Sequence, residues 1–193
     1  MLNKIIALCC LVMSLSLTSL QAEDKSIGYF DAIKAEAAPV SGETYYLRHC
    51  LMFEKDIHKT TNYWRGTLLP INTQVKVLSL KKDMVLKVEK TGQVFTVKNV
   101  ENFSRRSMVE IAHAMLTRTP VPIEKFEEDM AKQIASGNPK LGMTREQLVM
   151  TRGYPPGHKT PSLDSDKWIY WTSKLVYITY VFENGVIVAG RGL

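Results

Sequence analysis

The chain has 193 residues, with 25 Lys and Arg against 19 Asp and Glu, a formal net charge of +6 at pH 7. This positive charge is dispersed rather than gathered in one stripe, so no nucleic-acid partner is expected. It suits an anionic surface such as lipid headgroups or a wall polymer, and leaves peripheral membrane contact open.

The first 22 residues have the layout of a secretory signal peptide. Lys4 precedes an apolar run over residues 5–17, and a short polar end follows. We expect cleavage near Ala22 and a periplasmic mature protein. A membrane anchor is the alternative, but it requires about 20 consecutive apolar residues, whereas serines and a threonine interrupt this run.

Cys9 and Cys10 lie too early in that run for lipoprotein cleavage, so cleavage would leave Cys50 as the only cysteine. A single cysteine in an exported protein is either buried or pairs with another molecule. Burial is favoured because residues 45–53 are typical of one apolar strand. The neighbouring His49 raises the alternative of a thiol-dependent hydrolase, but neighbours on a strand point to opposite faces. No catalytic residue is therefore assigned.

Residues 23–41 are polar and alanine-rich, and we interpret them as a linker or arm. In residues 42–101 the apolar spacing is close to two and turn residues recur at short intervals. Strands are expected at residues 45–53, 67–69, 75–78, 84–88 and 94–97. Five short strands with hairpin turns predict a small barrel.

In residues 65–77, an arm ends in a turn of glycine or proline, and a strand with strongly alternating apolar residues follows. This pattern resembles the middle of bacterial SH3-like domains, so residues 42–101 are expected to form an SH3-like β-barrel domain. The resemblance implies contact with peptidoglycan or with a peptide.

Tyr63, Trp64 and Arg65 place two aromatic rings and a cation between two of these strands. Such residues often form a contact surface for a glycan or a peptide, so all three are candidate partner-binding residues. The alternative is structural, with Trp64 filling one end of the barrel.

Two helices are expected before the last third of the chain. Ser107 and Glu110 predict a capping box in a connecting helix within residues 102–120, which Pro120 ends. A second helix begins at Pro122, and Gly137 ends it.

The last third predicts a helix followed by a meander. Thr144 and Gln147 can form a capping box for a helix over residues 145–152, and Gly153 ends it. Strands are expected at residues 168–171, 175–182 and 186–188, with a tight Asn184-Gly185 hairpin between the last two.

The order Gly142-Met143-Thr144, helix, Gly153-Tyr154-Pro155, Trp168-x-Tyr170 and Phe182-x-Asn184-Gly185 resembles the BamE-like (SmpA/OmlA) family of small outer-membrane-assembly lipoproteins. The resemblance implies an α+β domain over residues 121–193, with two helices packed on a three-stranded antiparallel meander. It also implies protein–protein contacts in outer-membrane assembly or envelope maintenance. Arg152 stands where the family usually has leucine.

The loop over residues 154–161 is rich in proline and carries Tyr154, His158 and Lys159, which are further candidate partner-binding residues. The alternative is a loop that only covers the edge of the sheet. The four histidines show no metal-ligand spacing, and no phosphate loop or dinucleotide motif is present, so no metal and no cofactor are expected.

These observations predict an exported, non-enzymatic two-domain α+β protein that binds an envelope protein or peptidoglycan. A wall-active or thiol-dependent hydrolase is the alternative, and an inhibitor of a secreted enzyme is a third reading. The sequence leaves the partner's identity and the oligomeric state open.

Overall fold

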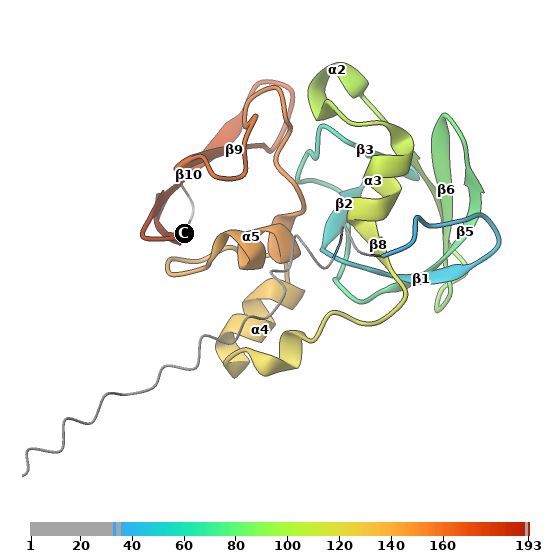
Figure 1. The fold of residues 1–193 in the computed structure, drawn as a ribbon, viewed down its shortest axis with the longest axis horizontal. Coiled ribbons are helices and arrows are strands. Elements are labelled where there is room, and N and C mark those ends of the chain that lie inside the picture. Colours follow the sequence, from blue (N-terminus) through green and yellow to red (C-terminus); the bar gives the residue numbers. More distant parts are fainter. Residues whose placement is uncertain (1–32, 34–35, 192) are drawn as a thin grey trace, which may run out of the picture.

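The computed structural model describes residue 33, residues 36–191 and residue 193. The predicted signal peptide, its expected cleavage site near Ala22 and most of the predicted arm over residues 23–41 lie outside the described residues. The described part contains eleven strands and four α-helices, in runs rather than in alternation, which confirms the α+β class. Figure 1 shows the two main sheets toward opposite ends of the molecule, with α3 and α5 between them.

A six-stranded sheet in the order β3-β7-β6-β5-β1-β8 dominates the first region of the chain, residues 42–119; residues 120–193 form the second region. Its strands are β1 (Thr44–Leu47), β3 (Ile57–Lys59), β5 (Gln74–Leu80), β6 (Asp83–Val88), β7 (Val94–Lys98) and β8 (Leu116–Thr117). All pairings are antiparallel except that of β3 with β7. A separate pair joins β2 (Leu51–Phe53) to β4 (Thr67–Leu69).

The predicted strands at residues 67–69, 75–78, 84–88 and 94–97 are confirmed to within two residues at their ends. Residues 42–101 nevertheless hold seven strands rather than five, because β3 was not expected and the strand at residues 45–53 is divided. Within the described residues, β3 and β8 are the edge strands of the six-stranded sheet. The SH3-like assignment stays a proposal.

The prediction of one strand over residues 45–53 is wrong. The chain leaves the sheet at Arg48, whose N–H donates to the Met115 carbonyl over 2.8 Å. The N–H of Cys50 donates to the Met150 carbonyl over 2.9 Å. The backbone here therefore satisfies the carbonyls at the ends of two helices instead of a strand ladder, a long-range arrangement that local spacing does not encode.

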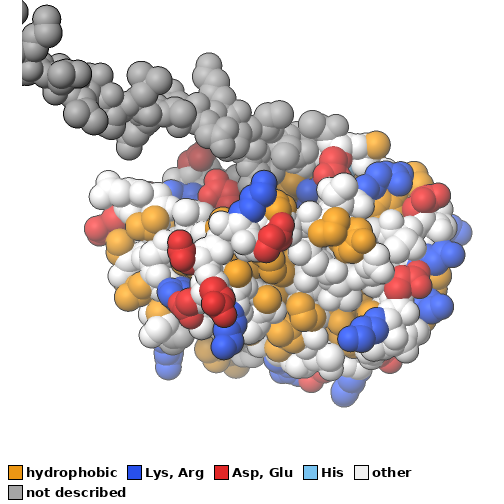
Figure 2. Space-filling model, turned by 90° about the horizontal axis from the view of Figure 1, so that it is seen from below, with side chains coloured by type: hydrophobic (Ala, Val, Ile, Leu, Met, Phe, Trp, Pro, Cys, Tyr) orange, Lys and Arg blue, Asp and Glu red, His pale blue; other side chains and the backbone are white. Residues whose placement is uncertain are grey.

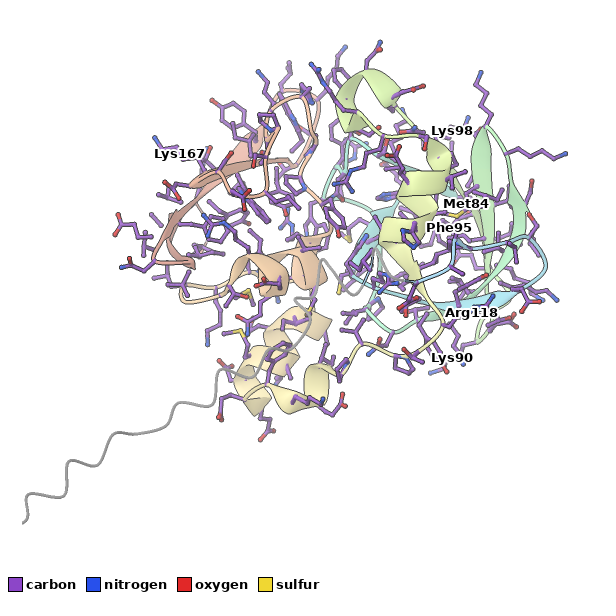
Figure 3. All side chains as sticks on the ribbon, viewed as in Figure 1. Met84, Lys90, Phe95, Lys98, Arg118 and Lys167 are labelled. Carbon is purple, nitrogen blue, oxygen red and sulfur yellow. The ribbon has the colours of Figure 1, made fainter. Side chains whose placement is uncertain are left out.

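The first core lies between α3 (Met108–Met115) and the six-stranded sheet. In Figure 3, Met84 and Phe95 lie on the side of the sheet that faces α3. Both are almost fully buried. The Ser107–Glu110 capping box is present as predicted. The predicted end at Pro120 is wrong, since α3 stops at Met115 and the next two residues pair with β1 as β8.

A single helical turn, α2 (Glu101–Ser104), precedes α3. The helix predicted from Pro122 to Gly137 is divided into a 3₁₀ turn, η1 (Ile123–Lys125), and α4 (Glu128–Ala135). Phe126 and Glu127 between them are extended, with ψ angles of 161° and 141°. The partly buried Phe126 ring packs on the second core, which offsets the lost helical hydrogen bonds.

The C-terminal elements follow the prediction closely. The helix α5 (Arg145–Arg152) carries the Thr144–Gln147 capping box, and Gly153 ends it at a φ of 73°. The strands β9 (Lys167–Trp171), β10 (Tyr177–Glu183) and β11 (Val186–Gly190) form an antiparallel meander. Asn184 and Gly185 have φ angles of 49° and 82°, as a tight hairpin requires. The β10 strand begins two residues later than expected, so Leu175 and Val176 lie in a turn.

The second core lies between α4, α5 and this meander. Its largest fully buried members are aromatic, namely Trp168, Tyr170, Tyr180 and Phe182. It also contains Cys50 and Ile71 from the first region, and partly buried Trp64 and Leu68 pack against it. The domain boundaries at residues 42–101 and 121–193 remain a prediction.

Candidate binding surfaces

A pocket with a positive rim lies beside the turn between β2 and β3. Its volume is about 270 Å³. We call it the basic pocket; it is lined by Met52, Glu54, Lys55, Ile57, Lys59, Tyr63, Arg65 and Lys174. Two of the candidate residues, Tyr63 and Arg65, therefore line one pocket.

Two tight features of the backbone build this pocket. Lys55 and Asp56 form the β2–β3 turn with φ angles of 51° and 57°, a region that non-glycine residues seldom adopt. Gly66 passes so close to the Phe53 carbonyl that an added Cβ would lie 2.2 Å from its oxygen. This close approach places Arg65 beside Glu54, whose Oε2 accepts from Arg65 Nε at 3.0 Å and Nη2 at 2.6 Å.

A row of four rings runs from α2 to the turn between β9 and β10. Phe103 lies 4.6 Å from His158, His158 lies 6.3 Å from Trp171, and Trp171 lies 5.6 Å from Tyr177, measured between ring centroids. We call this row the ring ladder. The backbone N–H of His158 donates to the Phe103 carbonyl over 3.0 Å, which fixes the 154–161 loop against α2.

The turn beyond the ring ladder exposes apolar side chains. Leu175 is 84% exposed, and Val176 and Tyr177 are also exposed. We call these three residues the apolar tip. The Trp64 N–H donates to the Trp171 carbonyl over 3.2 Å, so the loop carrying Tyr63 and Arg65 lies against β9. The basic pocket and the apolar tip are therefore neighbours, with Lys174 of the same turn lining the pocket.

Trp64 belongs neither to the basic pocket nor to the ring ladder or the apolar tip. Its ring packs on the second core, and the Arg152 guanidinium lies 4.0 Å from the ring centroid. Burial lowers the pKa of Arg152, and its Nε and Nη2 find no hydrogen-bond partner among the described residues. The structural alternative placed Trp64 at one end of the barrel. Its ring instead packs on the second core, so Trp64 links the first region to the second.

Tyr154 and Lys159 have separate surroundings. Tyr154 is half-buried, and the Arg106 guanidinium lies 4.4 Å from its ring centroid. It lines a narrow cavity of about 40 Å³ together with His49 and His58. Lys159 is exposed at the end of the proline-rich segment. The structure brings neither residue into the basic pocket or the ring ladder.

Cys50 and His49 are not arranged as a nucleophile and its base. The Cys50 thiol donates to the Ile134 carbonyl and accepts from the Ile71 N–H, each over 3.2 Å. His49 Nδ1 lies 2.8 Å from the Cys50 carbonyl oxygen rather than from the sulfur. Burial raises the pKa of the Cys50 thiol to about 11 and lowers the pKa of His49 to about 4. A thiolate at neutral pH is therefore disfavoured.

The charged side chains on one face of the molecule are dispersed. On the face shown in Figure 2, acidic and basic side chains are interspersed around small hydrophobic clusters. In the part of the chain that the structure describes, no His, Cys, Asp and Glu residues gather in a group that could hold a metal ion. No helix among these residues is long and apolar enough to cross a bilayer.

The sequence did not predict most of the residues of the basic pocket, the ring ladder and the apolar tip. Lys174 joins Arg65 only through long-range packing, and Phe103 and Trp171 reach His158 in the same way. Lys55 and Lys59 lie within about ten residues of Arg65, but the β2–β3 turn that brings them into the pocket was not predicted. The aromatic and aliphatic residues at 175–177 predict the beginning of a strand, and this pattern gives no sign that their side chains are exposed.

No protein-family model, curated protein or solved structure matches this chain. The BamE-like and SH3-like resemblances therefore rest on the sequence features quoted for them.

Proposed function

We propose that this chain is an exported, non-enzymatic protein of the cell envelope that binds a protein partner through the apolar tip and the ring ladder. The layout of residues 1–22 supports export, and the BamE-like resemblance supports a setting in outer-membrane assembly or envelope maintenance. Binding to peptidoglycan is the alternative that the SH3-like resemblance supports.

The exposure of the apolar tip carries this proposal. A single exposed leucine is common on protein surfaces. Here Leu175, which is 84% exposed, adjoins the exposed Val176 and Tyr177. The ring ladder then continues the patch through Trp171 and His158. Contiguous exposed apolar patches mark interaction sites, and aromatic residues dominate binding energy in protein interfaces. The aliphatic side chains at the apex favour a protein pocket over a glycan as the partner surface.

The geometry at Cys50 supports a binding role over the thiol-dependent hydrolase. The sulfur is fully buried and hydrogen-bonded to backbone groups from two other segments. A substrate could reach it only if the second core opened.

A pull-down from envelope extract with the mature protein tests the proposal. Leu175→Ser with Tyr177→Ser should abolish capture of a defined protein that the wild type retains. Val109→Ser is the matched control, because Val109 is 52% exposed on α3, outside the patch. Both variants should keep their stability to within about 0.5 kcal/mol, as exposed positions usually do.

Co-sedimentation with purified peptidoglycan runs in parallel. Equal capture by the tip variant and the wild type would exclude the apolar tip as the docking surface. Sedimentation with peptidoglycan in the absence of any captured protein would favour the wall-binding alternative.

A further inference from the structure

We infer that the basic pocket binds a small phosphate-bearing anion. The inference goes beyond the proposed function, because it concerns a different surface and a different class of ligand. The pocket contains no member of the ring ladder or of the apolar tip.

The charge of the pocket is the first observation. Four cationic side chains line it against one carboxylate, that of Glu54. Glu54 is already paired with Arg65. Lys55, Lys59 and Lys174 form no ion pair with any of the described residues. Three lysines that line one pocket and have no ion-pair partner among the described residues carry charges that repel one another, and an anion in the pocket would relieve that repulsion.

The conformation of Lys55 is the second observation. Two-residue hairpins with two positive φ angles favour Asn-Gly, because these residues tolerate the left-handed region. Here Lys55 and Asp56 occupy those positions. A lysine in this conformation is strained relative to glycine or asparagine, and strained residues cluster at ligand sites. The turn keeps a cation at the rim of the pocket despite that strain.

The donor types indicate the class of anion. The fork of Arg65, which is best suited to a planar carboxylate, is engaged by Glu54 through two nitrogens. The remaining donors are lysine ammonium groups, compact point charges that bind phosphate without planar geometry. Met52, Ile57 and Tyr63 line the same pocket and can hold a small organic part of the same ligand.

Such a phosphate has two sources: a free phosphorylated molecule, or the phosphate group of a lipid headgroup. Calorimetry on the mature protein distinguishes them with three probes: inorganic tripolyphosphate, citrate as a carboxylate control, and vesicles of phosphatidylglycerol in phosphatidylcholine. We expect tripolyphosphate to bind more tightly than citrate and more weakly as salt is raised.

Replacing the three lysines tests the pocket itself. The triple variant K55M/K59M/K174M should lose tripolyphosphate affinity by about tenfold or more. The matched control K81M/K82M/K90M removes the same charge from exposed positions in the β5–β6 and β6–β7 turns, and should bind within about twofold of the wild type. Glu54→Gln should bind more tightly, a gain that damage to the fold would not produce.

Several results would overturn the inference. Equal losses in the two triple variants would show that net charge alone attracts the anion. Equal binding of citrate would remove the phosphate class. Binding of vesicles without binding of tripolyphosphate would assign the effect to a membrane surface rather than to the pocket, whereas binding of both, each lost in K55M/K59M/K174M, would support a headgroup as the source.

Discussion

The two cores differ in where their residues come from. The first core draws all of its members from residues 45–116 and is mostly aliphatic. The second core has aromatic residues as its largest fully buried members, and takes Cys50 and Ile71 from the first region in addition to its own residues. Trp64 and Leu68 of the first region also pack on it. The first region therefore holds a hydrophobic core built from its own residues, whereas the core of the second region depends on side chains from the first.

The largest effect on stability is expected when the two regions are separated. We expect a fragment of residues 42–119 to unfold cooperatively, since its core is complete. A fragment of residues 120–193 should show no cooperative transition, because it loses the four side chains that the first region supplies. Thermal melts followed by circular dichroism measure both.

The same fragments test the domain boundaries predicted at residues 42–101 and 121–193. Cooperative melting of the C-terminal fragment alone would contradict the asymmetry and support two independent domains. Recovery of its melting only when the two fragments are mixed would support the shared core.

Acid should weaken the junction between the regions. Burial lowers the pKa of His49 from 6.5 to about 4 and also lowers that of His58. The unfolded chain therefore binds more protons between these pH values, so stability is full above pH 6.5 and falls as the pH drops toward 4. The loss from His49 alone is about 3 kcal/mol. Urea unfolding at pH 7 and pH 5 measures the onset of this loss.

His49→Asn should reduce that pH dependence without abolishing it, because the asparagine amide can still donate to the Cys50 carbonyl without titrating while His58 remains. His158→Asn is the control, and should keep the full dependence since both buried histidines remain. An unchanged slope in the His49 variant would show that other groups govern acid sensitivity.

Gly153 should resist replacement at the junction between the two regions. An added Cβ would lie 2.9 Å from the His49 ring, and φ is 73°. Gly142 has a similar φ of 82° with nothing within 4 Å, so it isolates the cost of the backbone conformation. We expect Gly153→Ala to cost about 2 kcal/mol or more and Gly142→Ala about 1 kcal/mol, in urea unfolding. Equal losses in the free energy of unfolding of the two variants would show that the His49 ring moves aside at no measurable cost.

The smallest effect is expected at Cys50. Cys50→Ser retains a donor and an acceptor and should cost about 1 kcal/mol, whereas Cys50→Ala leaves the Ile71 N–H without its acceptor and should cost more. Partner capture should be unchanged in both variants. A Cys50→Ser protein that is less stable than Cys50→Ala would show that packing, rather than hydrogen bonding, dominates at this position.

Local signals predicted local structure well. The capping boxes at Ser107 and Thr144 and the Asn184-Gly185 turn depend on residues within one turn of each other, so the chain itself specifies them. The division of the strand at Arg48 and the short strand after Met115 depend on partners far along the chain. Spacing alone cannot reveal such partners.

The candidate site shows the same limit. Tyr63, Arg65 and His158 were singled out because aromatic and cationic residues in loops often bind partners. The companions that make them into surfaces come from distant segments: Lys174 lies more than a hundred residues beyond Arg65, and Phe103 lies 55 residues before His158. The division of the helix at Phe126 escaped prediction because its cause is burial on the second core.

The placement of the three tryptophans has an optical consequence. Trp64, Trp168 and Trp171 all lie in or against the second region, and the first core has only tyrosine and phenylalanine as aromatic members. Intrinsic tryptophan emission will therefore report on the second region alone, while the dichroism of the backbone reports on both. A difference between the two melting curves would resolve the order in which the cores are lost, without any added label.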